Sequence, residues 1–122
     1  MTESEEQITI IVNDIPPSNN KFIGRNNRHG YKDYKEEWKL LMRSGMKNIP
    51  KKPIARAKVQ IHYTFPTKTR RDPDNFSGKI ILDPLVQYGI IEDDNFNCIN
   101  LVLTAEYEKG VKQTKVTVTE IK

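Results

Sequence analysis

Two aspartates, Asp72 and Asp74, stand two residues apart in the segment Arg70-Arg71-Asp72-Pro73-Asp74-Asn75. On an extended backbone such side chains point to the same side, and Pro73 stiffens the spacing between them. Two carboxylates held this close repel each other, and Mg²⁺ or Mn²⁺ relieves that repulsion because both ions prefer hard oxygen ligands. The pattern therefore indicates a metal site, while an Asp-Pro-Asp turn that caps a helix is the commoner meaning of such a segment.

Further charged residues surround this pair in the sequence. Lys68, Arg70 and Arg71 are cations beside the acids, which suits a substrate that is itself a phosphate. Lys79 lies little more than one helical turn past Asp74 and can stabilise charge on a phosphate, or it is a solvated lysine. Asp94, after the helix expected there, can return toward the start of that helix if the flanking strands are neighbours, or it belongs to a solvated turn.

The elements that must position these residues follow from apolar periodicity and from proline and glycine punctuation. The spacing predicts strands over 7–13, 57–65, 99–107 and 112–121, and helices over 31–45 and about 76–88. We expect Asp74 or Asn75 to cap the second helix, Gly89 to end it and Pro84 to kink it. The last strand, with exposed Lys and Thr, is expected at a sheet edge. The order β-α-β-α-β-β predicts an α+β fold.

Composition limits the function classes. The 122 residues suffice for one domain, 1–122, and the net charge of +4 favours polyanionic partners. The single cysteine, Cys98, allows no internal disulfide and fits a reducing compartment. No apolar run approaches the length of a membrane span, and the acidic N-terminus is unlike a signal peptide. We therefore expect a cytoplasmic protein that does not associate with a membrane. No Gly-rich phosphate loop or Cys/His zinc pattern is present, and we expect no organic cofactor.

Together, three segments in order resemble the RusA family of Holliday junction resolvases of bacteria and phages. They are Ile15 to Asn19, Arg70 to Asn75, and Lys79 to Asp94 with its Leu82-Asp83-Pro84-Leu85 run. The resemblance implies a single RusA-like domain with two helices on a mixed β-sheet. It also implies a homodimer that binds four-way junction DNA and nicks two opposed strands with Mg²⁺, or Mn²⁺, in recombination and repair.

By the same resemblance, the metal-binding and catalytic acids are Asp72, Asp74 and Asp94, and the catalytic lysine is Lys79. Lys79 follows Asp74 by five residues where the family leads us to expect four, which rotates a helical side chain by about 100°. The role of Lys79 therefore requires a helix that starts later. We expect the DNA backbone to be held by Lys68, Arg70 and Arg71, with Lys21, Arg25 and Arg28 from the first loop.

Three other functions remain open on the sequence. The first is a catalytically inactive protein that binds DNA junctions. The second is a related nuclease that acts on flaps or forks. The third is an interaction module that binds no nucleic acid and uses the acids as turns and caps; a steep loss of junction affinity with added salt would argue against it.

Overall fold

The computed structural model describes residues 7–17, 28–72, 76 and 78–121, with the side chains of 28, 29 and 31 also outside the description. Six elements follow one another in the order β-α-β-α-β-β, which confirms the predicted α+β domain. They are β1 (Gln7–Val12), α1 (Arg28–Gly45), β2 (Ala57–Phe65), α2 (Lys79–Gln87), β3 (Ile99–Tyr107) and β4 (Gln113–Glu120).

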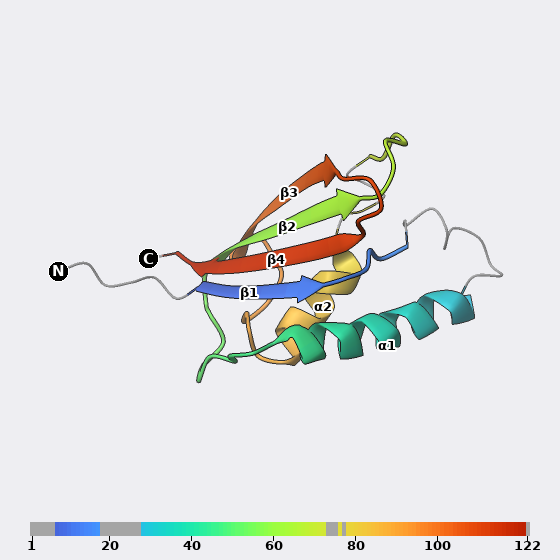
Figure 1. Cartoon of the computed structure of the whole chain (residues 1–122). Helices are drawn as coiled ribbons and strands as arrows, with labels where there is room; N and C mark the ends of the chain where they lie inside the picture. Colours follow the sequence, from blue (N-terminus) through green and yellow to red (C-terminus); the bar gives the residue numbers. More distant parts are fainter. Residues whose placement is uncertain (1–6, 18–27, 73–75, 77, 122) are drawn as a thin grey trace.

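The four strands form one mixed sheet in the order β1-β4-β2-β3 (Figure 1). β4 pairs antiparallel with β1 and with β2, so it lies in the middle. β2 pairs parallel with β3 from Ala57 opposite Ile99 to Phe65 opposite Tyr107, and α2 lies in the connection between them. The expectation that the last strand lies at an edge was wrong, because β4 has a partner strand on each side; its exposed Lys115 and half-buried Thr117 face the side of the sheet that no helix covers.

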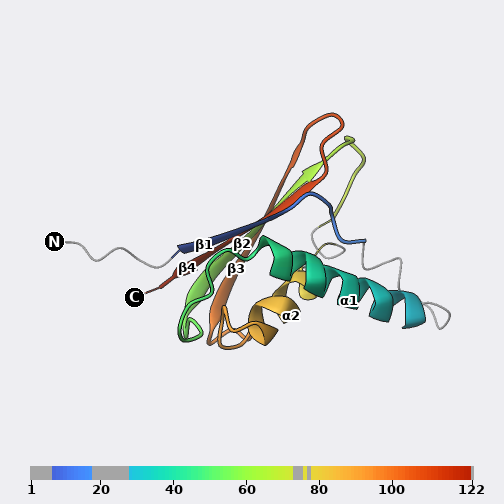
Figure 2. The ribbon, with the colours of Figure 1, turned by 60° about the horizontal axis from the view of Figure 1, so that its bottom comes forward.

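Both helices cover the same face of the sheet, as Figure 2 shows from below. The strand residues on that face, among them Ile10, Ile61 and Val116, are fully buried with Trp38 and Met42 of α1. The other face is open and polar. There His62 of β2 contacts the Thr104 hydroxyl at 2.6 Å and the Glu106 carboxylate at 2.8 Å, both from β3. Alternation of buried and more exposed residues, strict in β1 and clear through most of β2 and β4, thus separates the core from a polar surface.

α2 begins later than the sequence predicted. Its first helical residue is Lys79, and its N-cap is Gly78 with φ of 89°, so the expected start near 76 and the expected cap by Asp74 or Asn75 were wrong. A Cβ at Gly78 would lie 2.5 Å from Cδ1 of buried Ile61, and the Gly78 carbonyl accepts hydrogen bonds from the amides of Ile81 and Leu82. Glycine is therefore required where the chain turns under the sheet into α2.

The C-terminal part of α2 follows the prediction more closely. The helix continues through buried Pro84 to Gln87, and Gly89, with φ of 78°, comes directly after the C-cap Tyr88. Lys35 of α1 and Asp83 of α2 form an ion pair at 3.4 Å that joins the two helices. The Asp83 carboxylate of the Leu-Asp-Pro-Leu run thus contacts the neighbouring helix.

The direction of the strands gives the sheet two distinct ends. We call one the Phe65 end: here β1, β2 and β3 finish and β4 begins. We call the other the Ala57 end: here β2 and β3 begin. The loop after β2 and the turn from β3 to β4 both belong to the Phe65 end, whereas the segment between α2 and β3 belongs to the Ala57 end.

Candidate active site

The loop that leaves β2 at the Phe65 end is braced by Arg71. Nη1 of Arg71 donates to the carbonyls of Thr67 and Thr69, both at 2.9 Å, and Nη2 donates to the Thr67 hydroxyl at 2.8 Å. Its guanidinium lies 4.1 Å from the centroid of the Phe65 ring. Three hydrogen bonds and one ring contact from a single planar side chain hold the loop in a fixed shape. Arg71 thus positions the residues that follow it.

Asp72 follows Arg71 directly and is half-exposed. Nε of Arg70 donates to its carboxylate at 3.2 Å. Asp72 also lines a hollow of about 90 Å³ whose other walls include Phe76 and Leu103. One carboxylate of the predicted pair therefore lies at the rim of an apolar hollow, with a guanidinium beside it.

The floor of this hollow is an aromatic cluster that the sequence had assigned simply to the core. The rings of Tyr63, Phe65 and Phe76 contact one another with centroids 5.3–5.9 Å apart. The Tyr63 hydroxyl donates to the Phe76 carbonyl at 3.0 Å, and burial raises the pKa of Tyr63 well above its usual range. The position of Phe76, between the acidic motif and the helix, was the signal in the sequence that could have indicated this cluster.

Lys79 is exposed and is the first residue of α2. The preceding Gly78 lies against Ile61 and Leu103, and Leu103 also lines the hollow that contains Asp72. α2 therefore starts at Lys79, later than predicted, and a later start is what the proposed role of Lys79 required, given its five-residue spacing from Asp74. Asp74 itself lies outside the described residues.

Asp94 lies at the other end of the sheet. It follows the bridge between Ile54 and Ile91 and precedes β3, whose first residue pairs with Ala57. Asp94 was expected to lie near the start of α2 if β2 and β3 were neighbours. The two strands are neighbours, but they run parallel. The seven residues of β3 from Ile99 to Ala105, which lines the Asp72 hollow, span roughly 20 Å. Within one chain, the parallel pairing therefore places the segment before β3 and the loop after β2 at opposite ends of these two strands.

The surroundings of Asp94 are acidic. Its amide donates to the Asp93 carboxylate at 2.8 Å. Partial desolvation, followed by the interaction with the Asp93 carboxyl, raises the pKa of Asp94 above its usual value. Within the described part of the chain, no three His, Cys, Asp or Glu side chains form a group that could hold a metal ion. Those residues of a single chain do not by themselves fit a metal site.

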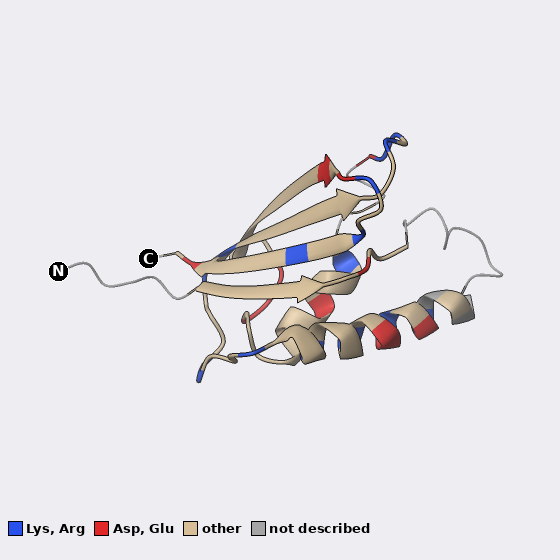
Figure 3. Ribbon diagram, viewed as in Figure 1, with Lys and Arg blue, Asp and Glu red and all other residues tan. Residues whose placement is uncertain are grey.

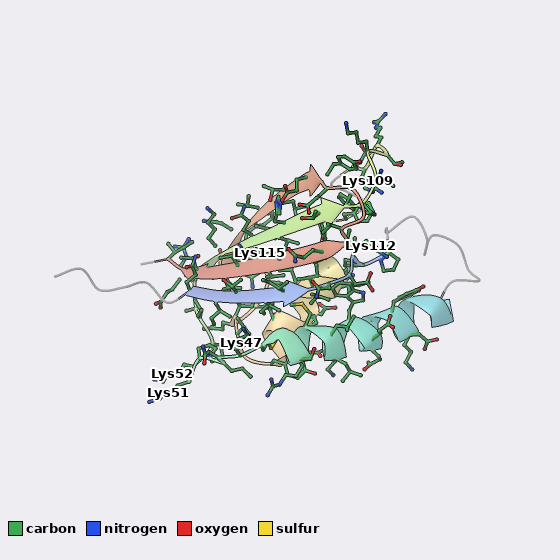
Figure 4. All side chains as sticks on the ribbon, in the orientation of Figure 1. Lys47, Lys51, Lys52, Lys109, Lys112 and Lys115 are labelled. Carbon is green, nitrogen blue, oxygen red and sulfur yellow. The ribbon has the colours of Figure 1, made fainter. Side chains whose placement is uncertain are left out.

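Basic residues gather at the Phe65 end, as Figure 3 shows for the loop after β2 and the turn after β3. Nζ of Lys68 lies 5.2 Å from the centroid of the Tyr107 ring at the end of β3. Lys109 and Lys112, which the sequence analysis did not single out, lie at the same end (Figure 4), and Lys112 pairs with Asp14 at 3.3 Å. Lys21 and Arg25 lie outside the described residues; Arg28 begins α1, with its side chain outside the description.

No helix in the described ranges is long and apolar enough to cross a membrane.

Comparison with known proteins identifies the family. A search of the curated proteins finds no match to the chain. The family model described as Endodeoxyribonuclease RusA matches residues 14–119, which include the braced loop, α2 and all strands except β1 and the last residue of β4. The chain belongs to the RusA endodeoxyribonuclease family.

Proposed function

We propose that this protein is a metal-dependent endonuclease that resolves four-way DNA junctions by paired nicks in opposed strands, in recombination and repair. The observation that carries the proposal is the braced loop at the Phe65 end. It presents the Asp72 carboxylate beside Arg70, at the end of the sheet where Lys68 lies over the Tyr107 ring and other basic residues gather. Carboxylates next to cations suit a reaction on a phosphodiester.

We propose that Asp72 and Asp74 act together with Asp94, and that Asp94 comes from a second copy of the chain. The parallel pairing of β2 and β3 supports this arrangement, because the segment with Asp94 precedes β3 at the Ala57 end whereas Asp72 follows β2 at the Phe65 end. A two-fold dimer would then contain two equivalent composite sites, which matches the two-fold symmetry of a four-way junction. Mg²⁺, with Mn²⁺ as a substitute, would supply charge stabilisation and an activated water at such a site.

The other roles follow from position. Lys79 at the exposed start of α2 would stabilise charge on the reacting phosphate. Lys68 and Arg70 would contact the DNA backbone and place the junction without reading its sequence. Arg71 would keep Asp72 in place through its hydrogen bonds to Thr67 and Thr69.

Cleavage of a labelled four-way junction and of a linear duplex of the same sequence tests the proposal, with Mg²⁺, Mn²⁺ or EDTA present. We expect paired nicks confined to the junction and dependent on the metal. Asp74→Asn should abolish cleavage and retain junction binding, whereas Asp33→Asn, at an exposed position of α1, should cleave normally. Normal cleavage by Asp74→Asn would contradict the site, and junction binding without cleavage in either metal would favour the inactive binding protein.

Mixing variants tests whether two copies share the site. Asp72→Asn and Asp94→Asn should each be inactive alone. In a mixed dimer of the two, one composite site carries both substitutions and the other carries none, so the mixture should recover single nicks. If both acids acted within one copy, every site in the mixture would carry a substitution. Absence of recovered nicking in dimers shown to be mixed would therefore contradict the shared site.

A further inference from the structure

Tyr107, the last residue of β3, presents an accessible aromatic ring at the Phe65 end of the sheet. It pairs in register with Phe65 of β2, so the two side chains lie on the same face. Phe65 is buried and carries the Arg71 guanidinium over its ring, whereas Tyr107 is 42% exposed. Lys68, an exposed residue of the loop after β2, holds its ammonium 5.2 Å from the centroid of the Tyr107 ring. The Tyr107 ring therefore lies outside the core, in a basic setting.

A second hollow, of about 360 Å³, opens beside this ring. Its walls include Thr67, Lys68, Thr69, Glu106 and Tyr107. The volume falls in the range of about 300–1,000 Å³ that is usual for small-ligand sites. Phe65, Arg71 and Ala105 line both this second hollow and the smaller one that contains Asp72, so the two adjoin. A group bound in the second hollow would therefore lie next to Asp72.

The polar walls of the second hollow favour a planar group with N–H donors. The Glu106 carboxylate lies 2.8 Å from Nε2 of His62 and 3.5 Å from the Thr64 hydroxyl, which fix its position on the polar face of β3. A carboxylate accepts hydrogen bonds and repels a phosphate. Every nucleobase carries an N–H donor on the edge that it uses for pairing, and this donor is free only when the base is unpaired. The hollow therefore suits an unpaired base, whereas the cations around it suit the phosphates of the same strand.

We propose that the second hollow binds one unpaired nucleobase, stacked on the Tyr107 ring, beside the phosphodiester at Asp72. In the free protein the Lys68 ammonium occupies a position over this ring. A base stacks on an aromatic ring more strongly than an exposed ammonium binds it, so the base displaces Lys68. The flexible lysine side chain then turns to the adjoining phosphate. Because every base has a π-face, the site selects an unpaired base whatever its sequence.

The role of this site in junction recognition rests on the proposed function. Releasing a base from its stack costs least where the base is already unpaired, as at a branch point. Tyr107 would then be a specificity-determining residue that favours a branch point over a continuous duplex. Stacking itself needs neither a junction nor a metal, so it can be measured independently of cleavage.

The first test compares two single strands of equal length, oligothymidine and a strand with abasic internal positions. Both carry the same phosphates, so any difference in affinity comes from the bases. By fluorescence anisotropy of the full chain in EDTA, we expect oligothymidine to bind at least about fivefold more tightly. Tyr107→Ala should remove this difference and leave the affinity for the abasic strand unchanged, which also shows that the variant is folded. Tyr107→Phe keeps the ring and should keep the difference.

Two further variants separate the ring from the charge. Lys68→Gln should weaken binding of both strands, because it removes a phosphate contact, and should lower the slope of log affinity against log salt by about 0.7. Leu40→Ala truncates a 68% exposed side chain of α1 and should change neither strand.

A cross-link locates the stacked base. A strand that carries 5-iodouracil forms a photochemical bond to an aromatic side chain on which that base stacks. After irradiation, digestion and mass spectrometry, we expect the modified peptide to contain Tyr107, and we expect Tyr107→Ala to lose the product. On four-way junctions in EDTA, the wild type should bind a junction with an unpaired thymine at the branch point more tightly than a fully paired one, and Tyr107→Ala should not distinguish them.

Equal affinity of the wild type for the two single strands would overturn the proposal. So would a preference for bases that survives Tyr107→Ala, or a cross-link that maps to another ring, such as the 98% exposed Phe96. Stacking on Tyr107 by a protein that cleaves no junction would leave the base site standing and contradict the proposed function. Metal-dependent junction cleavage by a protein with no preference for bases would do the reverse.

Discussion

Replacing Gly78 by alanine tests how the chain passes from the acidic motif into α2. Gly78 combines two demands: its φ of 89° lies in the left-handed region, and a Cβ would come within 2.5 Å of Cδ1 of Ile61, a fully buried side chain of β2. The left-handed conformation costs a non-glycine residue about 1–2 kcal/mol. Forcing a methyl group into a packed core costs about 1–3 kcal/mol. We therefore expect Gly78→Ala to lower the free energy of unfolding by about 2–5 kcal/mol.

Two matched glycines separate these contributions. Gly110, in the turn between β3 and β4, has φ of 78° and nothing within 4 Å of its Cβ position, so Gly110→Ala should cost only the conformational part, about 1–2 kcal/mol. Gly30, in α1, has open space and no positive φ, so Gly30→Ala should raise stability by about 0.5–1 kcal/mol. The three variants share one chemical change and differ only in their surroundings.

Urea unfolding, followed by circular dichroism, measures the three free energies. The double variant Gly78→Ala with Ile61→Val is the sharpest control, because valine lacks the Cδ1 methyl that the new Cβ would meet. The Ile61→Val change alone should cost about 0.5–1.5 kcal/mol. The double variant should be more stable than additivity predicts. If Gly78→Ala cost no more than Gly110→Ala, or if the double variant were additive, the close approach of Gly78 to Ile61 would be refuted.

Two further predictions concern the loop and the aromatic cluster. Arg71→Lys should lose the three hydrogen bonds to Thr67 and Thr69, and trypsin should cut loop 67–72 several-fold faster, with exposed Arg56→Lys as the unchanged control. Burial raises the pKa of Tyr63, so the folded state keeps a proton that the unfolded state loses near pH 10. Stability should therefore fall as the pH rises above about 10, and Tyr63→Phe should remove that component from unfolding measured at pH 9–11; an unchanged slope would contradict this reasoning.

Much of the fold could be predicted, because apolar residues alternate regularly in strands that bury only one face. The alternation from Ala57 to Phe65 and from Ile99 to Tyr107 gave the correct bounds for β2 and β3. The position of β4 could not be predicted from the same pattern. Polar residues such as Lys115 and Thr117 fit a strand edge and an uncovered face equally well in the sequence, and only the pairing of distant strands distinguishes the two.

The site was less predictable for the same reason. The acidic motif follows β2, as expected, but local sequence does not reveal whether two neighbouring strands run parallel, and that direction decides where Asp94 lies. The start of α2 depends on the contact of Gly78 with Ile61 and Leu103, residues 17 and 25 positions away. Capping preference favoured Asp74 or Asn75, and tertiary packing placed the cap at Gly78.

The middle position of β4 has a consequence for how the chain folds during synthesis. β4 is the last of the six elements to leave the ribosome, yet it is the strand that joins β1 to β2. Until residues 113–120 emerge, β1 has no strand to pair with, and the only strand pairing that the nascent chain can form is that of β2 with β3. The sheet therefore closes after translation of its final strand, and a premature stop codon before residue 113 would leave β1 without a strand partner, attached to the rest only through α1.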